Sequence, residues 1–321
     1  MSMMPMVKIK ISIIISMLVA LLPMKGHAQD SCWVQVRIPV ACIRDGKGHS
    51  TEMTSQAIMG TPMLVLEDDG GEWLHLKGPD GYEGYMNISS VAKKSHADIC
   101  RWRKSSRLVC VSLPEVKVYA TADGTDSRNV VTELVNGVIV EGILSDRLMT
   151  KITLPDGRSG WVQTSALSTI EDWANKPFDS DQILSTCYWL MGTPYLWGAC
   201  STKSVDCSGL VRVSYFANGI LMLRDARQQI EIGKRISEND LDSLQAADLL
   251  FFSNTPDGRI SHVAIYDKDG NYIHSSGLVK VNAMKDDDYD FSNRIYRGAS
   301  RINGMIPSEG ITSVGAHPWY F

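Results

Sequence analysis

The sequence lacks the features of two common classes of protein. It has no excess of basic residues, since 32 Lys and Arg stand against 36 Asp and Glu, for a net charge of −4. Such a chain has no general electrostatic attraction to nucleic acid or to an anionic membrane surface. It also has no Cys-x-x-Cys motif. A structural zinc site therefore has little support.

Long apolar runs are equally scarce. One run, residues 11–22, follows Lys8 and Lys10 and precedes the small residues at 26–28. We expect residues 1–28 to be a secretory signal peptide cleaved near Ala28. The run is short for a membrane span of roughly 20 residues, although an uncleaved anchor is the alternative. The protein is then exported to the periplasm or cell envelope with no other membrane attachment. Loss of three lysines takes its charge from −4 to −7.

The chain has seven cysteines, an odd number. An exported chain with an odd number keeps at least one thiol unpaired. Export permits disulfides, and Cys100 with Cys110 is one candidate pair. The sequence leaves the connectivity open.

The first half of the chain is typical of antiparallel β structure. Short apolar runs broken by Asp-Gly turns fill residues 33–91. The segment 79–91 recurs at 155–167, an offset of 76 positions, which implies two copies of one small unit. In each copy Pro-Asp-Gly is followed by x-x-Gly-aromatic, and this pattern resembles bacterial SH3-like domains. We expect the first over 29–100 and the second over 101–170.

The second half predicts an α+β domain over residues 179–321, after a linker at 171–178. A helix is expected from Ser180, a second from Cys207, and a third from residues 224–225 toward Gly233. Three strands with Asp-Gly turns follow, at 248–252, 262–266 and 271–274.

Cys207 is the candidate nucleophile. A free thiol, with a pKa of about 8.5, is only a few per cent ionised at pH 7. A helix N-terminus and an imidazole would both activate it. His262 begins a strand, and His274 lies on the next strand, about 4.8 Å away. His274 could orient the His262 ring and hold the tautomer that leaves one nitrogen free for the thiol.

Six motifs occur in an order and spacing that resemble the NlpC family, papain-like peptidases that cut bacterial cell-wall peptides. The resemblance covers residues 178–302, and Ala199 and Ala247 are small departures, at positions where the family often has Gly. It implies a multidomain protein in which two small all-β SH3-like barrels precede an α+β papain-like catalytic domain. The motifs are Tyr-Leu-Trp-Gly at 195–198, Asp-Cys-Ser-Gly at 206–209, Arg-Asp at 224–225, and the segments 247–252, 261–266 and 272–274.

The resemblance also implies roles for individual residues. Cys207 is the nucleophile, His262 the base and His274 the orienting residue, and no metal or organic cofactor is needed. The groove is lined by Tyr195, Trp197, Asp206, Ser208 and Asp225. Arg224 is expected to pair either with the surroundings of Asp225 or with a substrate carboxylate.

The paired barrels resemble a subgroup, the γ-D-glutamyl-L-diamino-acid endopeptidases, which act on short wall peptides with a free N-terminal L-alanine. In that subgroup the first barrel caps the groove, and acidic and tyrosine side chains hold the peptide's ammonium. Tyr82 is our candidate here, with Glu52 a weaker one.

We therefore expect a monomeric, exported cysteine endopeptidase whose partners are peptidoglycan stem peptides or muropeptide fragments. Two alternatives remain at this point. One is a catalytically silent wall-binding protein, and the other is an amidase or acyltransferase on the same fold. Whether the substrate is intact wall or a released fragment also stays open.

Overall fold

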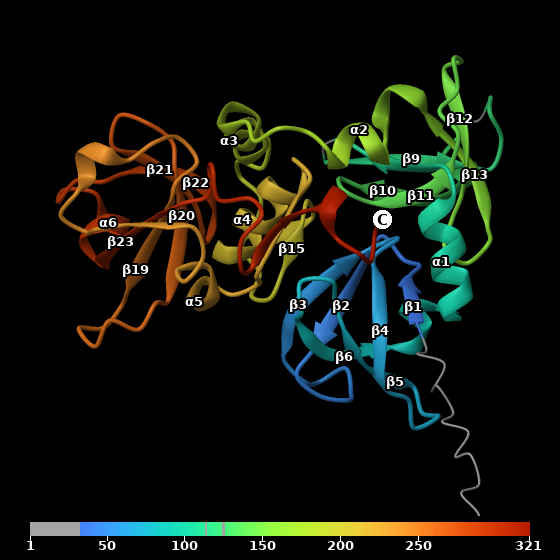
Figure 1. Ribbon diagram of the computed structural model, residues 1–321, viewed down its shortest axis with the longest axis horizontal. Helices are drawn as coiled ribbons and strands as arrows, with labels where there is room; N and C mark the ends of the chain where they lie inside the picture. The colour runs from blue at the N-terminus through green and yellow to red at the C-terminus, as the bar shows by residue number, and fades with distance from the viewer. Residues whose placement is uncertain (1–32, 113, 124–125) are drawn as a thin grey trace, which may run out of the picture.

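The structure is a computed structural model that describes residues 33–112, 114–123 and 126–321. The expected signal peptide, residues 1–28, lies outside the described residues. Two β sheets and a mixed α/β domain make up the described chain, with the mixed domain on the left of Figure 1 and the two sheets on the right. None of the helices in these three ranges is long and apolar enough to span a membrane.

The first sheet has seven strands in the order β3-β2-β6-β5-β4-β1-β7. The paired strands given by the register are antiparallel, as the Asp-Gly turns predicted. Its core is aliphatic and includes Val34, Met63, Leu74 and Leu76. The strands are β1 (Trp33–Val36), β2 (Val40–Arg44), β3 (Met53–Ile58), β4 (Pro62–Glu67), β5 (Trp73–Lys77), β6 (Glu83–Asn87) and β7 (Val91–Lys94).

The second sheet repeats the first. Its order is β10-β9-β13-β12-β11-β8-β14, so every strand takes the place of the strand seven numbers earlier. The offset of 76 found in the sequence holds for β5 and β12 and for β6 and β13. The internal repeat is thus confirmed. The strands are β8 (Arg107–Cys110), β9 (Glu115–Tyr119), β10 (Val130–Val135), β11 (Ile139–Gly142), β12 (Met149–Thr153), β13 (Ser159–Gln163) and β14 (Leu167–Thr169).

In both repeats, steric crowding requires the glycine that precedes the aromatic residue. A Cβ on Gly84 would lie 2.5 Å from Ile43 Cγ2, and a Cβ on Gly160 would lie 2.4 Å from Val118 Cγ1. Non-bonded carbon atoms do not approach each other this closely, so both copies need glycine where β6 and β13 pass a neighbouring strand.

Two helices at the domain junctions differ from our expectations. The boundary expected between residues 100 and 101 falls inside α1 (His96–Lys104), which Ser95 starts by a capping box. The segment expected as a linker, 171–178, begins within α2 (Ile170–Ala174). The α2 residue Trp173 is fully buried and donates a hydrogen bond to the Ala217 carbonyl at 3.0 Å, so this junction is packed.

The candidate disulfide is wrong for the described part of the chain, where Cys100 and Cys110 are both free thiols. Cys100 lies on α1 with its sulfur 3.3 Å from His96 Nε2. Cys110 is fully buried in the core of the second sheet. The two thiols therefore belong to different environments.

The mixed domain has a six-stranded sheet in the order β18-β23-β19-β20-β21-β22, and α4 packs on β20 and β21. The three expected strands are present as β19 (Leu249–Ser253), β20 (His262–Tyr266) and β21 (Asn271–Ser276). The third expected helix is only one turn, α5 (Ala226–Gln229). The other elements are α3 (Ser180–Trp189), β15 (Cys200–Ser201), β16 (Ser204–Val205), α4 (Cys207–Phe216), β17 (Ile220–Met222), β18 (Lys234–Ile236), β22 (Leu278–Ala283), α6 (Tyr289–Ser292), β23 (Ile295–Arg301) and β24 (Ile311–Ser313).

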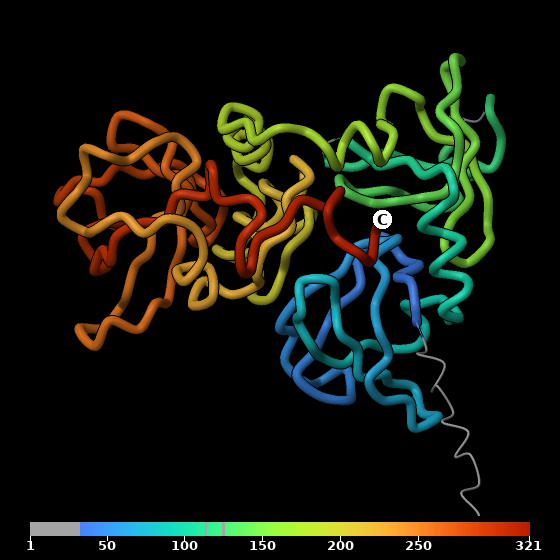
Figure 2. The backbone as a smooth tube through the Cα atoms, viewed as in Figure 1, coloured from blue at the N-terminus to red at the C-terminus, as the bar shows by residue number. Residues whose placement is uncertain are grey.

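The C-terminal segment holds the three parts together. Figure 2 shows it in red, running from the mixed domain into the space between the two sheets. His317 Nε2 lies 2.9 Å from the Pro79 carbonyl of the first sheet, and buried Arg107 of the second sheet donates to the Tyr320 carbonyl at 2.6 Å. The first sheet is thereby fixed beside the mixed domain.

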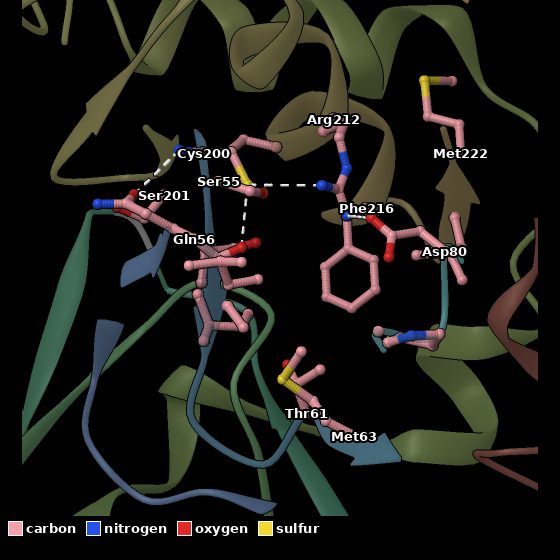
Figure 3. Close-up of a pocket in the computed structure, with 18 of the residues that line it drawn as sticks. Ser55, Gln56, Thr61, Met63, Asp80, Cys200, Ser201, Arg212, Phe216 and Met222 are labelled. Carbon is pink, nitrogen blue, oxygen red and sulfur yellow. Dashed lines mark hydrogen bonds and ion pairs between the residues drawn. The ribbon is translucent and has the colours of Figure 1, made fainter. Parts of the chain in front are cut away.

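A second contact between the first sheet and the mixed domain surrounds a small cavity of ≈70 Å³ (Figure 3). Arg212 of α4 forms an ion pair with Asp80 at 2.7 Å on one side of it. On another side, the Cys200 thiol donates to the Gln56 carbonyl of β3 at 3.5 Å. The contact of Cys200 with Gln56 places β3 against the segment that precedes α4.

Candidate active site

Cys207 is the first residue of α4, as expected from the sequence. Asp206 is the N-cap, and its Oδ1 accepts a hydrogen bond from the Gly209 N–H at 2.7 Å. The backbone N–H groups of Val263 and Ser208 act to lower the pKa of the Cys207 thiol. Burial, with a smaller contribution from the charge of Asp206, nevertheless raises the pKa of the Cys207 thiol to about 11. Without substrate the sulfur is therefore a neutral thiol at pH 7.

The antiparallel hairpin of β20 and β21 brings two histidines together. His262 Nε2 lies 2.8 Å from His274 Nδ1, and the ring planes are close to perpendicular at 84°. Burial lowers the pKa of His262 well below its usual value and lowers that of His274 to about 4. Both rings are neutral at pH 7. Because His262 uses Nε2 toward His274, its Nδ1 is the nitrogen left for a base.

Cys207 and His262 line the same cleft, of ≈670 Å³. Most of the wall comes from the mixed domain, but Thr54 and Tyr82 of the first sheet also line it. The cleft is therefore closed on one side by a separate domain. The remaining predicted residues that line it are Tyr195, Trp197, Asp206, Ser208 and Asp225.

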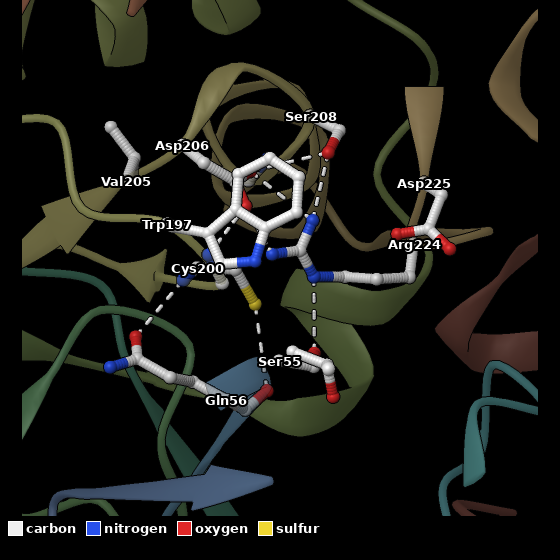
Figure 4. Close-up of polar contacts among 12 residues, drawn as sticks. Ser55, Gln56, Trp197, Cys200, Val205, Asp206, Ser208, Arg224 and Asp225 are labelled. Atoms are coloured by element: carbon white, nitrogen blue, oxygen red, sulfur yellow. Dashed lines mark hydrogen bonds and ion pairs between the residues drawn. The ribbon is translucent and has the colours of Figure 1, made fainter. Parts of the chain in front are cut away.

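Strand β3 and the residue before it make the contact between the first sheet and the cleft. A Cβ on Gly198 would lie 2.3 Å from the Met53 carbonyl oxygen, so the two backbones touch only because residue 198 is glycine. Trp197 donates from Nε1 to Glu52 Oε1 at 2.6 Å, and the Cys200 N–H donates to Gln56 Oε1 at 2.9 Å. Figure 4 shows the Gln56–Cys200 contacts beside Trp197.

Arg224 lies beneath the cleft, not in it. Its Nη2 contacts Asp206 Oδ2 at 2.5 Å, and its Nη1 donates to Ser208 Oγ at 2.8 Å (Figure 4). Nε donates to Ser55 Oγ of β3 at 3.1 Å. Arg224 is 2% exposed, and protein atoms accept its guanidinium hydrogen bonds. The structure thus gives Arg224 the partner Asp206 in place of a substrate carboxylate.

This geometry agrees with comparisons to known proteins. Residues 192–296 match the NlpC/P60 family. The chain carries an NlpC/P60 domain. Residues 43–91 match the bacterial dipeptidyl-peptidase Sh3 domain, which covers most of the first sheet. The second sheet has the same strand order as this SH3 domain.

Relatives and solved structures extend over both parts. Dipeptidyl-peptidase 6 of Lysinibacillus sphaericus is 28% identical over 246 residues, covering 73% of this chain and 84% of the relative. The gamma-D-glutamyl-L-lysine dipeptidyl-peptidase of Bacillus subtilis (strain 168) is 28% identical over 230 residues, covering 69% and 71%. A crystal structure of an NlpC/P60 family protein from Bacillus cereus ATCC 10987 has a TM-score of 0.73 at 19% identity, covering 84% of this chain and 99% of that one. That structure shows the shared fold.

The residues predicted from the sequence as substrate-binding do not all line the cleft between the NlpC/P60 domain and the SH3 domain. Tyr82 lines the cleft, whereas the Glu52 carboxylate accepts the Trp197 indole N–H and lies outside the described residues that form the cleft wall. Asp225 lines the cleft, and burial raises the pKa of its carboxyl. No group of His, Cys, Asp and Glu in the described part of the chain has the arrangement of a metal site.

The sequence reasoning missed two polar residues behind His274. Asn282 Oδ1 lies 2.8 Å from His274 Nε2, and the Asn282 amide donates to Asp288 at 2.8 and 2.9 Å. Asn282 lies on β22, where its partner across the ladder is Tyr272. The alternation of apolar and polar side chains over residues 278–283 was the available signal for a strand. Beside β21, that strand places Asn282 diagonally opposite His274 on the same face, where side chains can touch.

Proposed function

We propose that the protein is an exported cysteine endopeptidase that hydrolyses the γ-D-glutamyl–diamino-acid bond of peptidoglycan stem peptides. One observation carries the proposal: Cys207 and His262 line one cleft that the SH3 domain helps to close. The relatives named as γ-D-glutamyl-L-lysine dipeptidyl-peptidases supply the bond. Export rests on the signal-peptide pattern of residues 1–28.

The cleft residues account for the hydrolysis. Because the thiol and both imidazoles are neutral, His262 Nδ1 takes the Cys207 proton as sulfur attacks the γ-carbonyl carbon. The N–H groups at the start of α4 face the growing negative charge on oxygen. The imidazolium then returns its proton to the leaving amine as the C–N bond breaks, which leaves a thioester. Water, deprotonated by His262, adds to the thioester, and the thiol leaves with the proton.

The SH3 side of the cleft fits a substrate with a free N-terminal ammonium. An ammonium has only donors and therefore needs acceptors. The Tyr82 hydroxyl and the Asp225 carboxylate both line this cleft. Burial, with a smaller contribution from the charge of Asp225, raises the pKa of Tyr82. A wall at this end also favours released fragments over cross-linked strands, because the peptide terminus must fit beneath the SH3 domain.

A labelling experiment separates this proposal from a catalytically silent wall-binding protein. We expect iodoacetamide to modify Cys207 in the folded protein, because His262 can take the thiol proton as the sulfur attacks the reagent. We also expect Cys207→Ala to abolish hydrolysis of L-Ala-γ-D-Glu-diamino-acid peptides. A Cys207 that resists labelling while the protein still binds the peptide would favour the binding protein. Undiminished hydrolysis by Cys207→Ala would exclude Cys207 as the nucleophile.

A further inference from the structure

A row of four polar side chains runs away from the cleft. It begins at His262, passes through His274 and Asn282, and ends at Asp288, with heavy-atom distances of 2.8 Å at each of the first two contacts. His274 is fully buried. Asp288 is the N-cap of α6, where its Oδ1 accepts the Asp290 and Phe291 N–H groups. The row therefore links the candidate base to a helix cap.

The carboxylate of Asp288, at the far end of this row, determines which group donates in each hydrogen bond along it. An ionised carboxylate only accepts, and hydrogen bonds to the Asn282 amide and to backbone N–H groups lower the pKa of Asp288 despite its partial burial. The Asn282 NH₂ group must therefore face Asp288, which turns its carbonyl oxygen to His274. That oxygen can only accept, so His274 carries its proton on Nε2.

The tautomer of His274 in turn fixes that of His262. A neutral His274 with a proton on Nε2 has a lone pair on Nδ1. That lone pair accepts from His262, so His262 carries its proton on Nε2. The His262 Nδ1 is left with the lone pair, which is the state that a base facing Cys207 needs. In each contact a proton on one atom requires a lone pair on the other.

Asp290 is the charged group that could compete for His274. Its Oδ2 is 4.0 Å from His274 Nε2, beyond hydrogen-bond distance. Lys280 and Arg294 hold the Asp290 carboxylate at 2.5 and 2.9 Å. Two cations thus occupy Asp290, and the nearer, neutral Asn282 oxygen sets the tautomer.

We propose that Asp288, acting through Asn282, is a positioning residue that fixes the tautomers of His274 and His262 and so keeps His262 Nδ1 unprotonated. This inference rests on the proposed function for its catalytic meaning. The positions of the ring protons of His274 and His262, however, do not depend on any substrate.

Two swaps of amide and carboxylate test the row. In Asp288→Asn the new side chain keeps an acceptor for the α6 cap but places its NH₂ group toward Asn282. Because the new NH₂ group takes the place of Oδ2, the Asp288 oxygen nearer to the Asn282 amide, we expect Asn282 to turn over and present NH₂ to His274. That turn moves the His274 proton to Nδ1 and the His262 proton to Nδ1. The double variant Asn282→Asp with Asp288→Asn restores a pure acceptor beside His274 and a donor behind it. Its net charge equals that of the wild type.

The direct readout is ¹⁵N NMR of protein labelled at the histidine rings, at pH 8, without substrate. We expect Nε2–H tautomers for His262 and His274 in the wild type, the Nδ1–H form in Asp288→Asn, and the wild-type forms in the double variant. His262→Gln and His274→Gln assign the signals. Asp179→Asn is the matched control, because Asp179 caps α3 through the same kind of contacts.

Kinetics give the second readout. We expect Asp288→Asn to lower kcat about 100-fold or more with little change in KM, by analogy with other bases held in the wrong tautomer, and the double variant to recover most of the loss. Unchanged tautomers in Asp288→Asn, or an equal loss in Asp179→Asn, would overturn the proposal. If Asp288→Asn does not fold, Asn282→Leu serves instead, and a single fixed wild-type tautomer in that variant would also overturn it.

Failure of the proposed function and failure of the proposed role of Asp288 can be told apart. A wild-type protein that cleaves no γ-D-glutamyl peptide contradicts the proposed function. The tautomers measured in that same protein still support or overturn the role of Asp288 and Asn282.

Discussion

The carboxylate of Asp206 and the guanidinium of Arg224 form a buried ion pair at the N-terminus of α4, with 2.5 Å between Oδ2 and Nη2. Asp206 also caps the helix that begins with Cys207. Arg224 in turn reaches Ser55 of the SH3 domain. One ion pair therefore connects the candidate nucleophile to the domain that closes the cleft.

Removing the cation of this pair should destabilise the protein strongly. We expect Arg224→Met to lower the free energy of unfolding by about 3–5 kcal/mol, because Asp206 is left as an uncompensated buried charge. Urea unfolding measures the change. Arg128→Met is the control, since the Arg128–Asp126 pair is exposed and its loss should leave the free energy of unfolding nearly unchanged. Equal losses in the two variants would contradict this assignment.

The contact between Gly198 and Met53 can be tested by a single methyl group. Gly198 and Gly192 have nearly the same φ, +78° and +79°, but a Cβ on Gly192 meets nothing within 4 Å. Both alanine variants should lose about 1–2 kcal/mol from backbone strain. Gly198→Ala should lose more, and its KM should rise, because β3 must move away from the cleft. Thermal unfolding and steady-state kinetics that do not distinguish the two variants would argue against a tight docking of the SH3 domain.

The ammonium site proposed at Tyr82 and Asp225 predicts a selective change in KM. We expect Asp225→Asn and Tyr82→Phe to raise the KM of a peptide with free N-terminal L-Ala about tenfold or more, since a hydrogen bond to a charged group is worth about 1.5–3 kcal/mol. Cleavage of the N-acetylated peptide should be slow in the wild type and insensitive to both changes. Glu52→Gln keeps an acceptor for Trp197. Comparing its KM with that of Asp225→Asn shows which of the two carboxylates holds the ammonium.

Burial of His274 predicts a pH-dependent stability. Its pKa is about 4 in the folded protein and near 6.5 when unfolded, so between these values the unfolded chain binds the extra proton. The stabilisation is complete above pH 6.5 and is lost as pH falls toward 4, by on the order of 3 kcal/mol. Denaturant unfolding of the wild type and of His274→Gln at pH 7 and pH 4.5 measures it. A variant with the same pH dependence as the wild type would show that His274 is not the group responsible.

Local patterns predicted much of the fold and part of the site. The recurrence of residues 79–91 at 155–167 predicted two copies of one β unit, because turn residues and alternation are local signals. Cys207 at a helix start follows from the Asp-Cys-Ser-Gly sequence after a Gly-rich loop. The pairing of His262 with His274 follows from a short hairpin.

Contacts between distant segments were not predictable in this way. Arg224 meets Asp206, 18 residues away, and Ser55, 169 residues away, so its partner depends on how two domains dock. Asn282 reaches His274 only through the register of β21 and β22, and residues 278–283 were not recognised as a strand. Trp173 looked like part of a linker because nothing near it in sequence shows that Phe216 and Ala217 would cover it.

The most direct test of the account is mass spectrometry of the products formed from the free tripeptide L-Ala-γ-D-Glu-diamino acid by the wild type and by Cys207→Ala. We expect the wild type to release the dipeptide L-Ala-D-Glu and the free diamino acid, and the variant to leave the tripeptide intact. Cleavage between L-Ala and D-Glu, or the same two products from Cys207→Ala, would contradict the account.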